Sequence, residues 1–93
     1  SKTSQKQNSE SDREATEKKI VQWIESIGEK LEKAVDSGDL SEENAWEKWH
    51  EFKAEEIEPK IEAAVKSRVL SEEQAEQIWL KIREREEAQR KSE

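Results

Sequence analysis

An internal repeat constrains the fold of this chain more than any other feature. When the sequence is shifted by 30 residues, the segment 31–53 (LEKAVDSGDLSEENAWEKWHEFK) aligns without a gap on the segment 61–83 (IEAAVKSRVLSEEQAEQIWLKIR). Ten positions are identical, including the tetrapeptide Leu-Ser-Glu-Glu at 40–43 and 70–73. An ungapped match of this length predicts that the two segments form the same structural unit.

Each copy of the repeat is typical of a helix end, a tight turn and a helix start. Ser41 and Ser71 are suited to cap a helix, because a serine hydroxyl accepts a hydrogen bond from a first-turn amide. The glutamates that follow each serine place negative charge at the positive end of the helix dipole. Gly38 favours the end of the preceding helix, because glycine readily adopts the left-handed backbone conformation. Short turns at 37–40 and 67–70 therefore fold consecutive helices back on each other.

Two such turns predict an all-α fold, a three-helix antiparallel bundle built on the 30-residue repeat. The expected helices cover about 12–37, 41–67 and 71–90 within a single domain, residues 12–93. Ser11 and Glu14 have the spacing of a capping box for the first helix. Residues 1–11 contain no apolar side chain, so we expect a disordered tail that has nothing to bury.

Composition limits the size and the class of the protein. The chain has 93 residues, of which 44% are charged and only 30% are hydrophobic, so it supports one small core at most. No apolar run approaches the roughly 20 residues that a membrane span needs, and membrane insertion is not expected. The absence of cysteine excludes disulfides and zinc–thiolate sites.

Two residues leave alternatives open inside the predicted helices. Pro59 either kinks one continuous middle helix near 55–59 or marks a break and restart, and we favour the kink. Gly28 is either a tolerated surface glycine or a point of close approach by a neighbouring helix. The chain beyond residue 81 is almost entirely charged, which is typical of a solvated helix surface.

The four tryptophans fall into two groups. Trp49 and Trp79 occupy equivalent positions of the repeat on the apolar faces, so we expect both to be core anchors. Trp23 and Trp46 lie at the edges of apolar stripes, where a side chain is either core rim or partly exposed.

No residue pattern in the chain predicts catalysis or metal binding. Glu47 and His50 form a single Glu-x-x-His, whereas a di-iron bundle needs two such motifs and two further carboxylates. The segment that begins at Asp36 lacks two ligand positions and the glycine of an EF-hand loop. Glycine-rich phosphate loops and Ser/His/Asp groupings are missing as well. The sequence thus predicts no enzyme, no metal site and no cofactor.

Charge favours a protein partner over nucleic acid. The net charge is −7, without a basic stripe, which argues against nucleic-acid binding. The segment 38–67 alone carries −5, so a basic partner would be steered toward it. We therefore expect a protein–protein interaction module whose partner is an unidentified protein with basic character.

The alternative is a structural or self-associating helical repeat element of a larger protein, with the chain a monomer or a weak homo-oligomer. The sequence predicts no localisation.

Three residues are the candidate partner-binding groups, namely Trp46, His50 and Leu80. Trp46 and His50 have no counterpart in the second copy of the repeat, where Glu76 and Leu80 stand instead. A side chain that the sister copy lacks is less demanded by the shared fold, and exposed aromatics commonly anchor partners.

Overall fold

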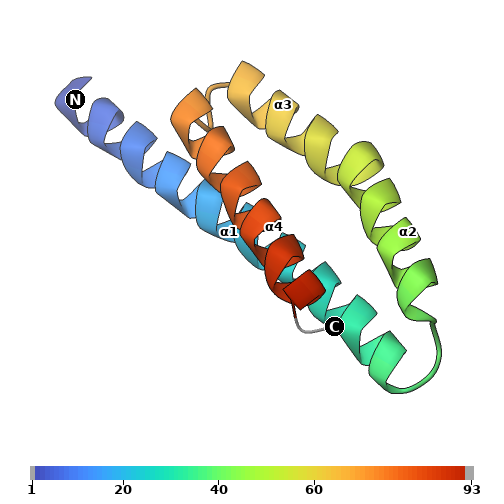
Figure 1. The fold of residues 1–93 in the computed structure, drawn as a ribbon. Coiled ribbons are helices and arrows are strands. Elements are labelled where there is room, and N and C mark those ends of the chain that lie inside the picture. The colour runs from blue at the N-terminus through green and yellow to red at the C-terminus, as the bar shows by residue number, and fades with distance from the viewer. Residues whose placement is uncertain (1, 92–93) are drawn as a thin grey trace.

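The computed structural model describes the backbone of residues 2–91 and the side chains of residues 12–90. The described backbone is all-α and consists of α1 (Lys2–Asp36), α2 (Glu42–Phe52), the π-helical segment η1 (Lys53–Ile57), α3 (Glu58–Lys66) and α4 (Glu72–Lys91). Since α2, η1 and α3 follow one another without interruption, the chain forms three helical rods (Figure 1). The predicted all-α, three-helix class is confirmed.

The three rods are arranged as two successive hairpins. The middle rod runs antiparallel to α1, and α4 turns back to run antiparallel to α3 and in the same direction as α1 (Figure 1). The molecule is elongated, with extents of 55 × 21 × 20 Å. Its long axis matches α1, whose 35 residues span about 52 Å at 1.5 Å per residue.

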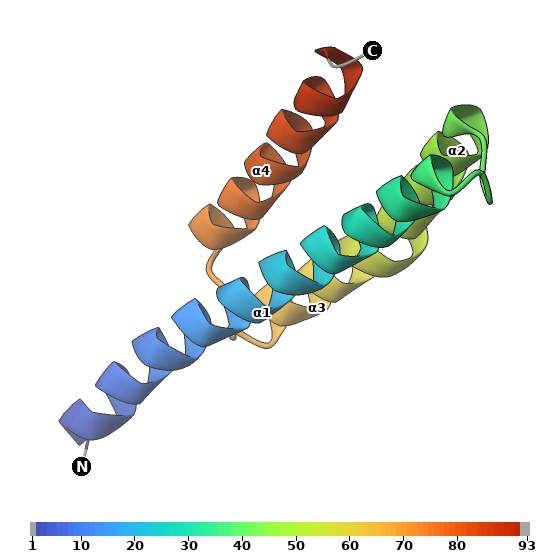
Figure 2. The ribbon, with the colours of Figure 1, turned by 90° about the horizontal axis from the view of Figure 1, so that it is seen from below.

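The first helix begins earlier than the sequence predicted. The backbone of α1 is helical from Lys2, not from residue 12, and its first turns extend past the other helices (Figure 2). The capping role expected of Ser11 falls on a side chain outside the described residues. Disorder of residues 1–11 in solution stays a prediction.

The two turns are built by the same hydrogen bonds at an offset of 30 residues. After α1, the amides of Gly38 and Asp39 donate to the carbonyls of Val35 and Ala34. After α3, the amides of residues 68 and 69 donate to the carbonyls of residues 65 and 64 in the same way. This is the Schellman pattern, which places the residue after the helix in the left-handed region. Gly38 takes it with φ 85°, whereas Arg68 takes it with φ 67°, a conformation that disfavours a side chain.

The predicted serine caps are present at both helix starts. The Ser41 hydroxyl accepts from the Asn44 amide, and the Ser71 hydroxyl accepts from the Gln74 amide, both at 3.1 Å. Only the second cap is a full capping box, because the Gln74 side chain also accepts from the Ser71 amide at 3.0 Å. The Gln74 side-chain amide then donates to Glu17 of α1 at 2.9 Å, which fastens the start of α4 to the first helix.

Pro59 perturbs the middle helix without breaking it, as favoured from the sequence. Proline has no amide hydrogen and its ring clashes with the carbonyl four residues earlier. The helix widens just before it into η1, where the Glu58 amide donates to the Lys53 carbonyl five residues back. The backbone on both sides of η1 stays right-handed helical, so the two halves remain one rod.

The buried core is small and lies off-centre in the bundle. Among residues 12–90, nine side chains are buried, eight from the three rods and Leu70 from the second turn: Ile20, Ile24, Trp49, Ile57, Ile61, Ala64, Leu70, Ile78 and Ile82. The apolar stripe of α1 continues past Ile24 through Leu31 and Val35, but these two side chains are only half-buried. Leu31 and Val35 stay partly exposed because α4 diverges from α1 toward the C-terminal end of α4 (Figure 2).

A candidate protein-binding groove

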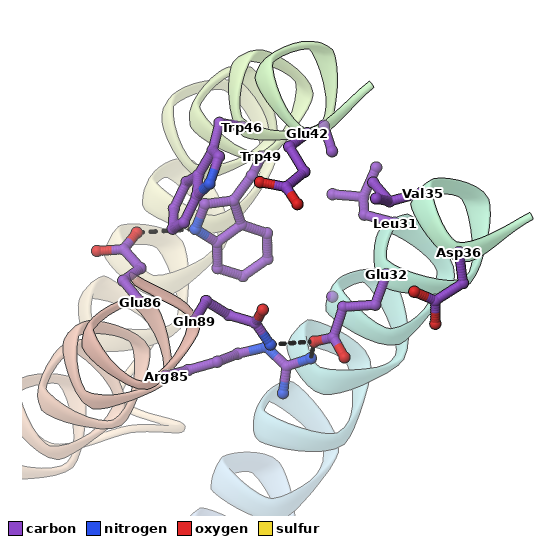
Figure 3. A pocket seen from close by; sticks show the side chains of 12 residues that line it. Leu31, Glu32, Val35, Asp36, Glu42, Trp46, Trp49, Arg85, Glu86 and Gln89 are labelled. Atoms are coloured by element: carbon purple, nitrogen blue, oxygen red, sulfur yellow. Dashed lines mark hydrogen bonds and ion pairs between the residues drawn. The ribbon is translucent and has the colours of Figure 1, made fainter. Parts of the chain in front are cut away.

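A groove opens where α4 diverges from the α1–α2 hairpin. Its volume is about 520 Å³, within the roughly 300–1,000 Å³ of typical ligand sites. Twelve residues of three helices line it, namely Gly28, Leu31, Glu32, Val35, Asp36, Glu42, Ala45, Trp46, Trp49, Arg85, Glu86 and Gln89 (Figure 3). The aliphatic and aromatic side chains come from the hairpin, and α4 contributes only polar ones.

The groove carries more negative than positive charge. Four carboxylates line it, those of Glu32, Asp36, Glu42 and Glu86, and the first and last of these are ion-paired with Arg85 and Lys53. Neither Asp36 nor Glu42 has an ion-pair partner among the described side chains. The groove therefore combines an apolar wall with an excess of negative charge, which suits a ligand that is both apolar and cationic.

Arg85 crosses the groove and ties α4 to α1. Its guanidinium forms an ion pair with Glu32 at 2.5 Å, and Gln89 donates to the same carboxylate oxygen at 2.8 Å. Gly28 makes room for this crossing, because a Cβ there would lie 2.6 Å from Arg85 Nε. Gly28 is thus the point of close approach that the sequence left open, although the approaching group is a side chain of α4 and not its backbone.

Glu86 ties α4 to the middle rod in a similar way. Its Oε2 accepts a hydrogen bond from the Trp49 indole at 2.7 Å and another from the Lys53 ammonium group. Partial burial raises the pKa of Glu86, but the hydrogen bonds from Lys53 and Trp49, with the nearby charges of Lys53 and His50, more than offset this. The net effect lowers the pKa of Glu86 below its ordinary value of 4.5, so the carboxylate form stabilises the contact.

Trp46 lines the groove, and two side chains, His50 and Arg90, lie against its ring. His50, one turn later on α2, stacks on it with centroids 5.8 Å apart and planes inclined by 29°. The Arg90 guanidinium of α4 lies 6.0 Å from the Trp46 ring centroid, at the outer limit of a cation–π contact. Trp46 is half-buried, so part of its ring area is available to a partner.

The structure brings together two of the three predicted partner-binding residues. Trp46 and His50 form the stacked pair on α2, but only Trp46 of the two lines the groove, and His50 is exposed beside it. Leu80 is 48% exposed but lies elsewhere, since it does not line the groove. It stands ten residues before Arg90, about 15 Å along α4, and opposite the buried Ile78 and Ile82.

The expected equivalence of the two core tryptophans holds only in part. Trp49 is 6% exposed and is confirmed as a core residue. Trp79 is half-buried and packs against the edge of the core. The difference arises because Trp49 lies between α1 and α4, where Glu86 also satisfies its indole N–H.

Sequence reasoning missed the part of the site that α4 contributes. The segment beyond residue 81 was expected to be solvated surface, but Arg85, Glu86 and Gln89 are half-buried. A signal for this was present, because these residues continue the 3–4 spacing of Ala75, Ile78 and Ile82. The inward face of α4 thus continues through polar residues, which a search for apolar side chains overlooks.

Other classes of site find little support in the described residues. Within residues 12–90, no three His, Asp or Glu side chains gather in an arrangement that would hold a metal ion. None of the helices in the described backbone is long and apolar enough to cross a bilayer. No protein-family model, curated protein or solved structure matches the chain.

Proposed function

We propose that the chain is a small, non-enzymatic protein–protein interaction module that binds a basic, amphipathic segment of a partner protein. The binding site is the groove between α1, α2 and α4. The observation that carries the proposal is an aromatic wall, Trp46 and Trp49, beside the carboxylates of Asp36 and Glu42, which form no ion pair with the described side chains.

The two parts of the groove would contribute differently to binding. The partner's apolar side chains would pack on Trp46, Leu31 and Val35, which the fold leaves half-covered. Large aromatic anchors of this kind supply most of the affinity at protein interfaces. The carboxylates would raise the association rate of a basic segment and select against acidic ones. A helix that lays one apolar face into the groove is the simplest occupant, because it presents apolar and basic side chains on adjacent faces.

Self-association is the second candidate, and the distribution of charge supports it. Residues 29–47 contain seven acidic and two basic side chains, whereas residues 81–91 contain five basic and three acidic ones. The basic end of α4 in one copy therefore complements the acidic hairpin end of another. Sedimentation over a concentration series distinguishes the two candidates, because only self-association predicts a mass that grows with concentration.

The proposal is tested by titrating the protein with two synthetic amphipathic helices. Both peptides carry leucines at helical core spacing, and their polar face is arginine in one and glutamate in the other. We expect the arginine peptide to bind, its affinity to fall as salt is added, and the glutamate peptide to stay unbound. Equal binding of both peptides, or no binding of the arginine peptide, contradicts the proposal.

Two variants locate the site on the molecule. Trp46→Ala should weaken binding of the arginine peptide about tenfold or more, as expected for an aromatic anchor. Leu80→Ala is the matched control, because it removes an exposed apolar side chain of α4 that does not line the groove. If Leu80→Ala weakens binding and Trp46→Ala does not, the interaction surface lies on the outer face of α4 instead.

A further inference from the structure

Two arginines of α4 approach the groove, and the structure holds them very differently. Arg85 is ion-paired to Glu32 and passes over Gly28, where an added Cβ would require the end of the Arg85 side chain to shift. Arg90 is exposed, and its one described contact with the groove is the 6.0 Å approach to the Trp46 ring. Arg85 is thus held in the groove wall by an ion pair, whereas the described contact of Arg90 is a single distant approach to an aromatic ring.

A guanidinium close to Trp46 has an ion-pair partner within reach that Arg90 does not use. Glu42 precedes Trp46 by four residues on α2, so the two side chains share one face of the helix. The Glu42 carboxylate points into the groove beside Trp49 and Leu31 (Figure 3). Glu42 makes no ion pair with Arg90 or with any other described side chain. A guanidinium entering from the partner side would be able to stack on Trp46 and pair with Glu42 together.

We infer that Trp46 and Glu42 form a recognition site for one arginine of the partner, and that Arg90 occupies the Trp46 ring until that arginine displaces it. The inference rests on the proposed function and deepens it by naming the chemical group of the partner that the groove recognises. Arginine fits better than lysine, because the planar guanidinium stacks on an aromatic ring and forms two parallel hydrogen bonds to a carboxylate. The partner's arginine displaces Arg90 because only it gains the Glu42 contact.

The test compares three variants of the 93-residue chain for binding of the arginine peptide, with a lysine version of the same peptide as reference. Arg90→Gln removes the competitor and should raise affinity for the arginine peptide about two- to fivefold, the change that matches one exposed cation–π contact. Arg83→Gln is the matched control, because it removes the same charge from an exposed position of α4 outside the groove. It should leave the affinity unchanged.

The third variant tests the recognition site itself. Glu42→Gln should weaken binding of the arginine peptide and reduce its advantage over the lysine peptide. Equal effects of Arg90→Gln and Arg83→Gln would overturn the role of Arg90, since both would then act through net charge. Equal affinity of the wild-type chain for both peptides would overturn arginine recognition while the proposed function stands. No binding of either peptide would overturn both.

Discussion

The two ends of the bundle share one kind of turn but differ in what covers the helices beside it. At the end near residues 67–70, which we call the closed end, the core side chains Ile61, Ala64, Leu70 and Ile78 are buried. At the end near residues 37–40, the open end, the apolar side chains Leu31, Val35, Leu40, Ala45 and Trp46 are only half-buried. Similar turn chemistry therefore does not determine how completely a helix pair is packed.

Helix α4 causes the difference between the two ends. Near the closed end α4 places Ile78 toward the hairpin, and Gln74 binds α1 through hydrogen bonds to Arg13 and Glu17. Near the open end α4 places Arg85 and Glu86 toward the hairpin instead. Polar side chains reach across a space that they do not fill, so the apolar wall of the hairpin stays accessible. The closed end holds most of the buried core, and the open end is the surface that we propose for binding.

The largest expected effect is a difference in lost stability between alanine variants of Trp49 and Trp79, the two equivalent tryptophans of the repeat. Trp49→Ala should destabilise the protein by about 3–5 kcal/mol, because it removes a buried aromatic side chain. Trp79→Ala should cost less, since Trp79 is only half-buried. Thermal or urea denaturation measures both, and Trp49→Phe serves as a control that keeps bulk but removes the indole donor to Glu86. Equal losses at the two positions would contradict the assignment.

Substitution of the leucine before each serine cap compares the packing of the two ends directly. Leu70 is 2% exposed, and Leu70→Ala should cost about 2–5 kcal/mol. Leu40 occupies the same position in the first turn but is half-buried, so Leu40→Ala should cost about 1 kcal/mol or less. Urea denaturation of the two single variants is sufficient. A larger loss at Leu40 would show that the open end carries the core.

A smaller effect concerns the residues with positive φ in the two turns. Gly38→Ala should destabilise the protein by about 1 kcal/mol, because an L-residue is strained at φ 85°. Arg68→Gly should stabilise it by up to about 1 kcal/mol, because glycine relieves the strain at φ 67°. Melting temperatures of the pair should move in opposite directions. If both fall, the backbone of the second turn is not strained.

The smallest effect is the pH dependence that Glu86 contributes. Its pKa is lowered in the folded state, so its stabilising contribution is present above the unfolded-state pKa near 4.5 and is lost as pH falls below it. The ion pair with Lys53 is partly solvated, so its share is about 1 kcal/mol or less. Denaturation of Glu86→Gln should show a shallower loss of stability on acidification than wild type. Parallel curves would exclude this contribution.

The sequence predicted the connections of this fold better than its packing. Ser41, Ser71 and Gly38 specify turns through local hydrogen bonds, and these turns and the three-helix class were predicted from residue type alone. The continuity of the middle helix through Pro59 was also predicted, although not the π-helical segment that precedes the proline. Local chemistry of this kind depends on neighbours in sequence, which a sequence displays directly.

In the groove that we propose as the binding site, Trp46 is the one lining residue that the sequence singled out as a partner-binding group. His50 was chosen with it because both break the repeat, but His50 does not line the groove. Arg85, Glu86 and Gln89 were assigned to solvent. Their burial depends on how α4 crosses the hairpin, which is a tertiary property. The role of Gly28 likewise depends on the Arg85 side chain that passes over it, 57 residues later in the chain.

The most direct test of the account is a two-dimensional proton–nitrogen NMR titration of the protein with the arginine peptide. The largest chemical-shift changes should fall on the indole N–H signals of Trp46 and Trp49 and on the amides of residues 28–36, 42–46 and 85–90. Signals of the closed end, residues 61–78, should change least. Shifts centred on Val69 and Leu80, or no shifts at saturating peptide, would contradict the claim that the open end of the bundle is the binding surface.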